Sequence, residues 1–185
     1  MSKKYLIASD IHGSAYWCKI LLETFENTGA DTLVLLGDIL YHGPRNPLPD
    51  GYAPQEVFAM LNKIKHKIVC VRGNCDSEVD QMVLEFPIMA DYAWISDGDM
   101  ALFATHGHLF NTQTPPLLKK GQVLLNGHFH TPTHVEMENG ALYANCGSVA
   151  LPKDGTPHSC ILVENNELTW LDLETGGMFD YLRIE

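Results

Sequence analysis

Apolar runs alternate with amphipathic segments in the first part of the chain. Short, nearly continuous apolar runs at Tyr5–Ser9, Thr32–Leu36 and Lys67–Val71 predict buried strands. Between them, apolar residues recur every three or four positions, which predicts one helix after Ser14 and another from Pro54. This order of strand, helix, strand, helix and strand predicts parallel pairing through right-handed crossovers.

The remainder of the chain is predicted to be mostly β-structure, after one short helix at Ser77–Leu84. We therefore expect one domain over residues 1–185, of mixed α/β (α+β) class, in which two packed sheets are flanked by helices. Strands are predicted at Tyr92–Ile95, Met100–Thr105, Val123–Asn126, Val135–Met137, Leu142–Asn145, Cys160–Val163, Leu168–Leu173 and Phe179–Ile184.

The composition narrows the range of partners. A net charge of −11 argues against an extended nucleic-acid surface or an anionic-membrane surface, because both need basic patches. The sequence contains no long apolar run, and its five cysteines form no close pairs, which favours a reduced, cytoplasmic protein. We expect a small-molecule substrate, and the apolar edge near Tyr92–Ile95 would permit a homo-oligomer.

Side chains of the types that bind metals follow five of the predicted strands. Their carboxylate, amide and imidazole groups suit two borderline divalent ions and do not suit a thiolate zinc site. Taken singly each motif is weak, since a carboxylate after a strand often caps a helix and an asparagine often occupies a turn. The residues are Asp10, His12, Asp38, Asn74, His106, His128 and His130.

The order of these motifs is specific. The succession Asp-x-His, Gly-Asp, Gly-Asn and Gly-His-x-His resembles the calcineurin-like metallophosphoesterase superfamily, between Tyr5 and Pro152. The segments Gly73–Asp80, Thr105–His108 and Gly147–Val149 resemble its YfcE-type phosphodiesterase branch more closely. The resemblance implies an αββα fold, a two-sheet sandwich with flanking helices. It also implies hydrolysis of a small phosphodiester by attack of a metal-bound hydroxide.

The resemblance also implies how the metal ligands divide. Asp38 would bridge two divalent ions, of which Mn²⁺ is favoured and Zn²⁺, Fe²⁺ or Ni²⁺ are alternatives. One ion would be held by Asp10, His12, Asp38 and His130, and the other by Asp38, Asn74, His106 and His128. The catalytic positions would be Asp38, Asn74, Cys75 and His108.

One position departs from the wider superfamily. Many members have histidine as the general acid where this chain has Cys75, and a thiol is a weaker proton donor at neutral pH. Good leaving groups should therefore be favoured. Asp76, which would orient that histidine, is then expected to be a structural acceptor or helix cap, while His108 is either a phosphate contact or a structural residue.

Several alternatives stay open at this point. A phosphomonoesterase could use the same site, and a scaffold resembling a retromer subunit could retain the fold with a vestigial metal site. His42 and Arg45 lie in the Pro-rich loop Tyr41–Ala53, where solvent exposure is favoured over a substrate contact. The sequence identifies neither the physiological substrate nor the native metal.

Overall fold

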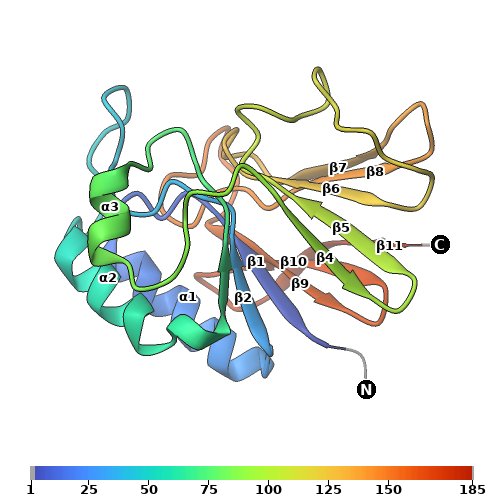
Figure 1. The fold of residues 1–185 in the computed structure, drawn as a ribbon. Coiled ribbons are helices and arrows are strands. Elements are labelled where there is room, and N and C mark those ends of the chain that lie inside the picture. Colours follow the sequence, from blue (N-terminus) through green and yellow to red (C-terminus); the bar gives the residue numbers. More distant parts are fainter. Residues whose placement is uncertain (1–2, 185) are drawn as a thin grey trace.

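The computed structural model describes residues 3–184, and six of its strands form the first sheet (Figure 1). The sheet order is β11-β10-β9-β1-β2-β3. As predicted, β1, β2 and β3 pair in parallel, whereas β9 pairs antiparallel with β1. The strands are β1 (Tyr5–Ala8), β2 (Thr32–Leu35), β3 (Ile68–Cys70), β9 (Ser159–Glu164), β10 (Glu167–Asp172) and β11 (Met178–Arg183).

Five strands form the second sheet, in the order β4-β5-β6-β8-β7. Its three central strands, β5, β6 and β8, are parallel, while β4 and β7 are antiparallel edges. The strands are β4 (Ala93–Asp97), β5 (Met100–Ala104), β6 (Val123–Asn126), β7 (Thr133–Glu136) and β8 (Leu142–Asn145).

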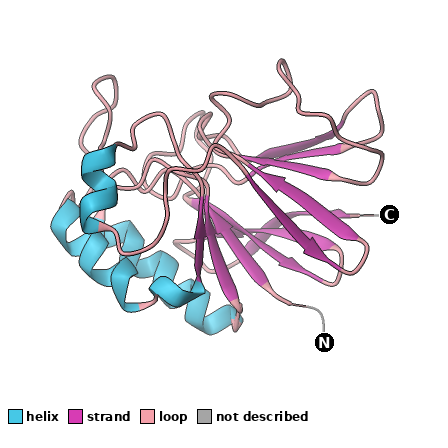
Figure 2. Ribbon diagram, viewed as in Figure 1, coloured by secondary structure: helices cyan, strands magenta, loops and turns pink. Residues whose placement is uncertain are grey.

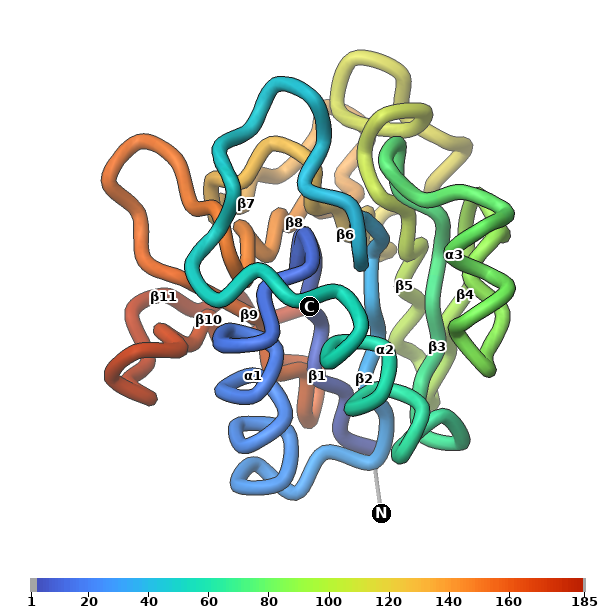
Figure 3. Tube along the Cα trace, turned by 90° about the vertical axis from the view of Figure 1, so that its left-hand side faces the viewer, coloured from blue at the N-terminus to red at the C-terminus, as the bar shows by residue number. Residues whose placement is uncertain are grey.

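The helices lie against the first sheet, as Figures 1 and 2 show, and Figure 3 shows α1 and α2 in front of β1 and β2. Ser14 caps α1 (Ala15–Thr28) by accepting a hydrogen bond from the Trp17 amide, and Gly29 ends it in the left-handed conformation. The other helices are α2 (Pro54–Lys63), a 3₁₀ turn (Lys65–Lys67) and α3 (Glu78–Val83). Two packed sheets flanked by helices are therefore confirmed.

Three apolar layers hold these elements together. α1 and α2 pack on the outer face of the first sheet, and side chains such as Ile7, Leu102 and Trp170 fill the space between the sheets. On the outer face of the second sheet a loop takes the place of a helix, because Phe110 and Leu118 cover Phe103 and its neighbours. The helices therefore flank one side of the sandwich.

All the predicted strands agree with the structure to within two residues at each end, and the largest shifts are at the edge strands β4 and β7. The predicted strand was 135–137, whereas β7 spans Thr133–Glu136. This edge strand is mostly exposed, so no alternation of buried and exposed residues marks its limits.

Among the described residues, no helix combines the length and the apolar character needed to cross a bilayer.

Candidate metal centre

The loops that follow parallel strands of both sheets meet at one place (Figure 1). Side chains just beyond the carboxyl ends of parallel strands converge at a sheet edge, and here two such edges face each other. Asp10 and His12 follow β1, Asp38 follows β2, Asn74 follows β3, His106 follows β5, and His128 and His130 follow β6.

The first group of donor atoms surrounds Asp10. The Asp10 Oδ1 atom lies 3.4 Å from His12 Nε2 and 3.2 Å from His130 Nε2. The two imidazole Nε2 atoms are 3.4 Å apart, and Asp38 Oδ2 is 3.7 Å from His12 Nε2. Four donor atoms from three loops thus face one point.

The second group surrounds His106. Its Nε2 atom lies 3.0 Å from Asn74 Oδ1, 3.1 Å from His128 Nδ1 and 3.6 Å from Asp38 Oδ2. Asp38 Oδ2 is therefore close to both groups. This is the place that a bridging carboxylate would occupy.

Backbone carbonyls determine which imidazole nitrogens carry protons. A carbonyl oxygen only accepts hydrogen bonds, so an Nδ1 atom facing one must be the protonated nitrogen, and Nε2 then presents a lone pair. The three contacts are His12 Nδ1 to Tyr41 O at 2.8 Å, His106 Nδ1 to Leu36 O at 2.8 Å, and His130 Nδ1 to Leu151 O at 2.6 Å. The lone pairs of three imidazoles consequently point into the centre.

This donor set fits divalent cations. When both rings are neutral, Nδ1 of His12 and of His130 donates to a carbonyl and the two unprotonated Nε2 atoms face each other, while Asp10 Oδ1 is buried without a hydrogen-bond partner. Around an ion with bonds of about 2.1 Å, neighbouring ligands lie roughly 3.0–3.5 Å apart, which is close to the observed separations. Carboxylate, amide and imidazole donors of this kind suit Mn²⁺, Fe²⁺ or Zn²⁺.

Protons and metal ions compete for the donor atoms of this site. Burial would raise the pKa of Asp10, but the charge of His106 and hydrogen bonds from protonated His12 and His130 outweigh it, so the pKa lies well below its usual value. Burial would lower the pKa of His12, but its hydrogen bond to Asp10 and the charge of that carboxylate raise it. Burial and the neighbouring His106 lower the pKa of His128 to about 4. Asp10 is therefore a carboxylate and His128 is neutral at pH 7.

The backbone is strained at most of these positions. Five of the seven residues adopt a left-handed conformation, with φ between 48° and 64°, which typically costs about 1–3 kcal/mol for a residue other than glycine. Such strain persists only where the surrounding structure determines it, and it gathers at functional sites. The five are Asp10, His12, Asp38, His128 and His130.

Asp76 ties two of the ligand loops together. Its carboxylate accepts hydrogen bonds from the amides of Asp38 at 2.8 Å, Ile39 at 2.9 Å and Gly73 at 2.7 Å. Burial and the charge of Asp38 raise the pKa of Asp76, while the amide donors oppose this. The expectation of a structural acceptor is confirmed, and its effect is to set Asp38 against Asn74.

Cys75 lies at the open side of the centre. Its amide donates to Asp38 Oδ1 at 2.8 Å, and the Asn74 side chain donates to its Sγ at 3.3 Å. Burial and the Asp38 carboxylate raise the pKa of Cys75, so the thiol is protonated at neutral pH. A thiol held in this state is a poor acid, in agreement with the expectation from the sequence.

His108 and His42 occupy less direct positions. The His108 ring lies 5.4 Å from that of His106, but His108 is not among the residues that line the cleft, and its catalytic role stays a prediction. Burial and His106 lower the pKa of His108. His42 packs edge-on against Tyr41 and Tyr52, away from the cleft lining.

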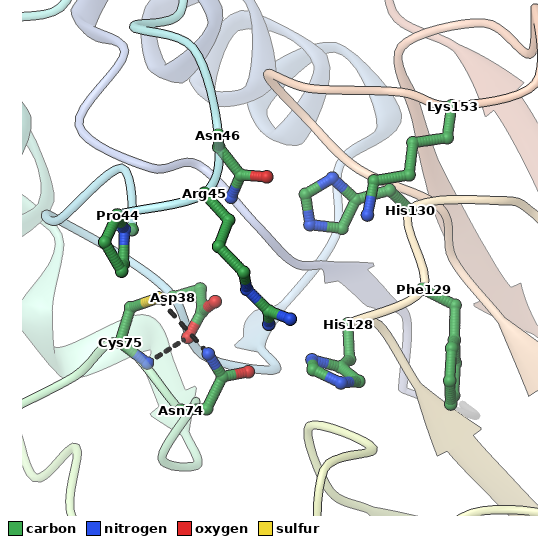
Figure 4. A pocket seen from close by; sticks show the side chains of 11 residues that line it. Asp38, Pro44, Arg45, Asn46, Asn74, Cys75, His128, Phe129, His130 and Lys153 are labelled. Atoms are coloured by element: carbon green, nitrogen blue, oxygen red, sulfur yellow. Dashed lines mark hydrogen bonds between the residues drawn. The ribbon is translucent and has the colours of Figure 1, made fainter.

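A cleft of about 440 Å³ opens onto the centre (Figure 4). Besides the predicted Asp38, Asn74, Cys75, His128 and His130, it is lined by residues for which the motifs predicted no role at the site. Arg45 was expected to be a solvated loop residue, and Lys153 and Phe129 had no predicted role, since no repeating pattern distinguishes a cleft residue from an exposed one.

Known proteins show a close similarity. Residues 4–167 match the calcineurin-like phosphoesterase superfamily domain. The chain is 48% identical over 181 residues to the phosphodiesterase YfcE of Escherichia coli K12, covering 98% of both chains. The structure of YfcE, a phosphoesterase from E. coli, superposes with a TM-score of 0.94 at 45% identity, covering 98% of this chain and 100% of that one. Vps29 of Chaetomium thermophilum shares the fold alone. It superposes with a TM-score of 0.60 at 15% identity, covering 99% of this chain and 100% of that one.

Gly73→Ala tests the close approach of the two loops. A Cβ atom at this position would lie 2.1 Å from Asp38 Oδ1 and 2.4 Å from the Asp38 amide, so Asp38 must move. We expect the metal content of the purified protein to fall by at least about half. Gly177→Ala is the matched control, because its nearest contact is 3.3 Å away. Unchanged metal content in Gly73→Ala would contradict the placement of Asp38.

Proposed function

Because the chain belongs to the calcineurin-like phosphoesterase superfamily, we propose that it is a phosphodiesterase that uses two divalent ions, Mn²⁺ foremost, to hydrolyse a small phosphodiester. One observation carries the proposal: two groups of carboxylate, amide and imidazole donor atoms share Asp38 Oδ2 beside a cleft. The five free cysteines support a cytoplasmic location.

The residues divide into two ligand sets with a common member. When bound, a pair of such ions clamps a phosphoryl group, makes water a stronger nucleophile and stabilises the departing oxygen. Asp10, His12, His130 and Asp38 would hold one ion, and Asp38, Asn74, His106 and His128 the other.

The protein contributes orientation and protonation state. Carbonyl acceptors fix the tautomers of three imidazoles, which keeps their lone pairs directed at the centre. Asp76 holds the Asp38 amide beside the turn that carries Asn74. The neutral Cys75 thiol faces the cleft, where it adds no charge and provides little proton donation to a leaving alcohol.

A diester is favoured over a monoester because the similar E. coli protein is named a phosphodiesterase. The weakly acidic Cys75 thiol limits the cleavage of poor leaving groups in either kind of ester. An interaction scaffold is disfavoured because the donor set is complete and its lone pairs converge. A homo-oligomer through β4, an edge strand with Trp94 partly exposed, stays a prediction.

Removal of metal is the direct test. The chelated protein should lose activity toward bis(4-nitrophenyl) phosphate and regain part of it with Mn²⁺. Parallel assays with 4-nitrophenyl phosphate separate the diester from the monoester reaction. Full activity after exhaustive chelation would refute the proposal, and a metal-loaded protein that turns over neither ester would favour the scaffold.

The bridging role of Asp38 predicts an asymmetry between two variants. Asp38→Asn should lower activity by more than about 100-fold, since its carboxylate serves both ion sites, and Asn74→Ala should cost about 10- to 100-fold. Metal analysis should show both ions lost in the first variant and mainly one in the second. Equal, small losses would contradict the assignment of Asp38.

Cys75→His should change the preference for leaving groups. An imidazole with a pKa near 6.5 donates a proton to an alkoxide better than the thiol does, so esters with poor leaving groups should gain relative to nitrophenyl esters. A Cβ at Gly43 would lie 3.1 Å from Cys75 Sγ, so the larger ring must displace this loop. Metal content is the control. An unchanged leaving-group dependence at full metal content would exclude position 75 from proton transfer.

A further inference from the structure

Two basic side chains line the cleft without carboxylate partners. The other two arginines, Arg72 and Arg183, lie 2.7 Å and 3.8 Å from Asp91 and Glu167, whereas Arg45 forms no ion pair within residues 3–184. Lys153 likewise has no ion pair in this range. In a chain of net charge −11, unpaired basic side chains beside a cleft favour the binding of an anionic ligand.

The two side chains come from different loops. Figure 4 shows Arg45 reaching from its loop into the cleft toward Asn74 and His128, while Lys153 comes from the other side. The Asn46 side chain donates to the His42 carbonyl at 2.9 Å, which stabilises the Arg45 loop. The Lys153 amide donates to the His130 carbonyl at 3.1 Å, which fixes the position of Lys153 relative to the centre.

The charges expected at the centre balance without Arg45 and Lys153. Two divalent ions would bring about four positive charges, of which Asp10 and Asp38 offset about half, and an activated water together with a singly charged diester offsets about the rest. The scissile phosphate therefore needs neither Arg45 nor Lys153. An additional anionic group on the substrate would match them.

A wall of the cleft is also apolar. Phe129 lines it with 44% of its surface exposed, in the loop that carries His128 and His130. An exposed aromatic ring beside unpaired cations suits an organic moiety that itself carries charge.

We propose that the substrate is a phosphodiester with a second anionic group, a phosphate or carboxylate, on one of its alcohols, and that Arg45 and Lys153 bind this group. The inference rests on the proposed phosphodiesterase function and specifies its substrate class. Arg45 and Lys153 are thus specificity residues that select for the charge beyond the scissile phosphate.

Matched substrate pairs test the proposal on the Mn²⁺-loaded protein. Thymidine 5′-(4-nitrophenyl phosphate) is compared with its 3′-phosphorylated form, and 4-nitrophenyl ethyl phosphate with 4-nitrophenyl 2-carboxyethyl phosphate. The member with the additional anionic group in at least one pair should have a kcat/KM higher by about fivefold or more, mainly through KM. The pair that responds identifies a phosphate or a carboxylate.

Substitutions locate the source of the preference. Arg45→Gln and Lys153→Gln should each reduce the ratio within the responding pair by about two- to fivefold, and Arg45→Lys should retain part of it. Lys63→Gln changes the net charge equally at an exposed position on α2, and it should leave the ratio unchanged. An equal reduction in Lys63→Gln would mean that the overall field of the protein, and not the cleft, sets the preference, and would overturn the proposal.

Two further results would also overturn it. A wild-type ratio near one in both pairs would exclude selection for a second anion. Equal losses in both members of a pair, together with a loss toward 4-nitrophenyl phosphate, would place Arg45 on the scissile phosphoryl group.

Calorimetry keeps this inference separate from the proposed function. Thymidine 3′,5′-bisphosphate should bind the Mn²⁺-loaded protein about fivefold or more tightly than thymidine 5′-phosphate, and Arg45→Gln should reduce that difference. If no diester is turned over, the proposed function fails, yet this measurement still decides the anion site. Equal affinities without any carboxyethyl preference would refute it.

Discussion

Repulsion among electron-rich atoms at the centre is the constraint on which the rest of the structure depends. Asp10, Asp38 and three imidazole lone pairs are directed at each other over 3.2–3.7 Å, in surroundings that are mostly buried. Burying such groups without compensation is costly, so protons on the imidazoles or metal cations among the donor atoms must offset the repulsion. The fold must hold these donors in place against their repulsion, and the left-handed backbone at five positions is part of that cost.

The two sheets meet this constraint through close backbone approach. A Cβ on Gly127 would lie 2.0 Å from Ser9 Oγ and 2.6 Å from Asp10 Oδ2, so glycine alone lets the β6 loop reach the β1 loop. The amide of His128 then donates to Asp10 Oδ2 at 2.9 Å, which links the second sheet to the first. Asp76 links two loops of the first sheet in a similar way, by accepting hydrogen bonds from the amides of Asp38 and Gly73. The glycines of the motifs are therefore as much a part of the centre as its ligands.

The sequence predicted the parts of the site that depend on residue type and order, and failed where three-dimensional packing decides. The positions of Asp38 and Asn74 just after predicted strands predicted that they lie close together, because the carboxyl ends of parallel strands meet at one edge of the sheet. The sequence pattern did not predict that β9–β11 belong to the first sheet. Apolar alternation indicates that a strand is buried, but it does not identify the strand beside it. The limits of β7 are shifted by two residues and one residue from the prediction, because an exposed edge strand has no clear alternation of buried and exposed positions.

The division between a predictable centre and an unpredictable cleft follows from how each is built. The ligands need particular donor atoms on fixed loops, so residue type and spacing reveal them. Recognition of the substrate depends on Arg45, Lys153 and Phe129, which sit on separate loops and share only their place in the cleft. From the sequence, a long flexible side chain in a Pro-rich loop, such as Arg45, is expected to be solvent-exposed. The structure shows that Arg45 lines the cleft and forms no ion pair within residues 3–184, so its charge can contact a bound anion. The chemistry of the centre can therefore stay constant while changes at these few positions alter which phosphodiester is bound.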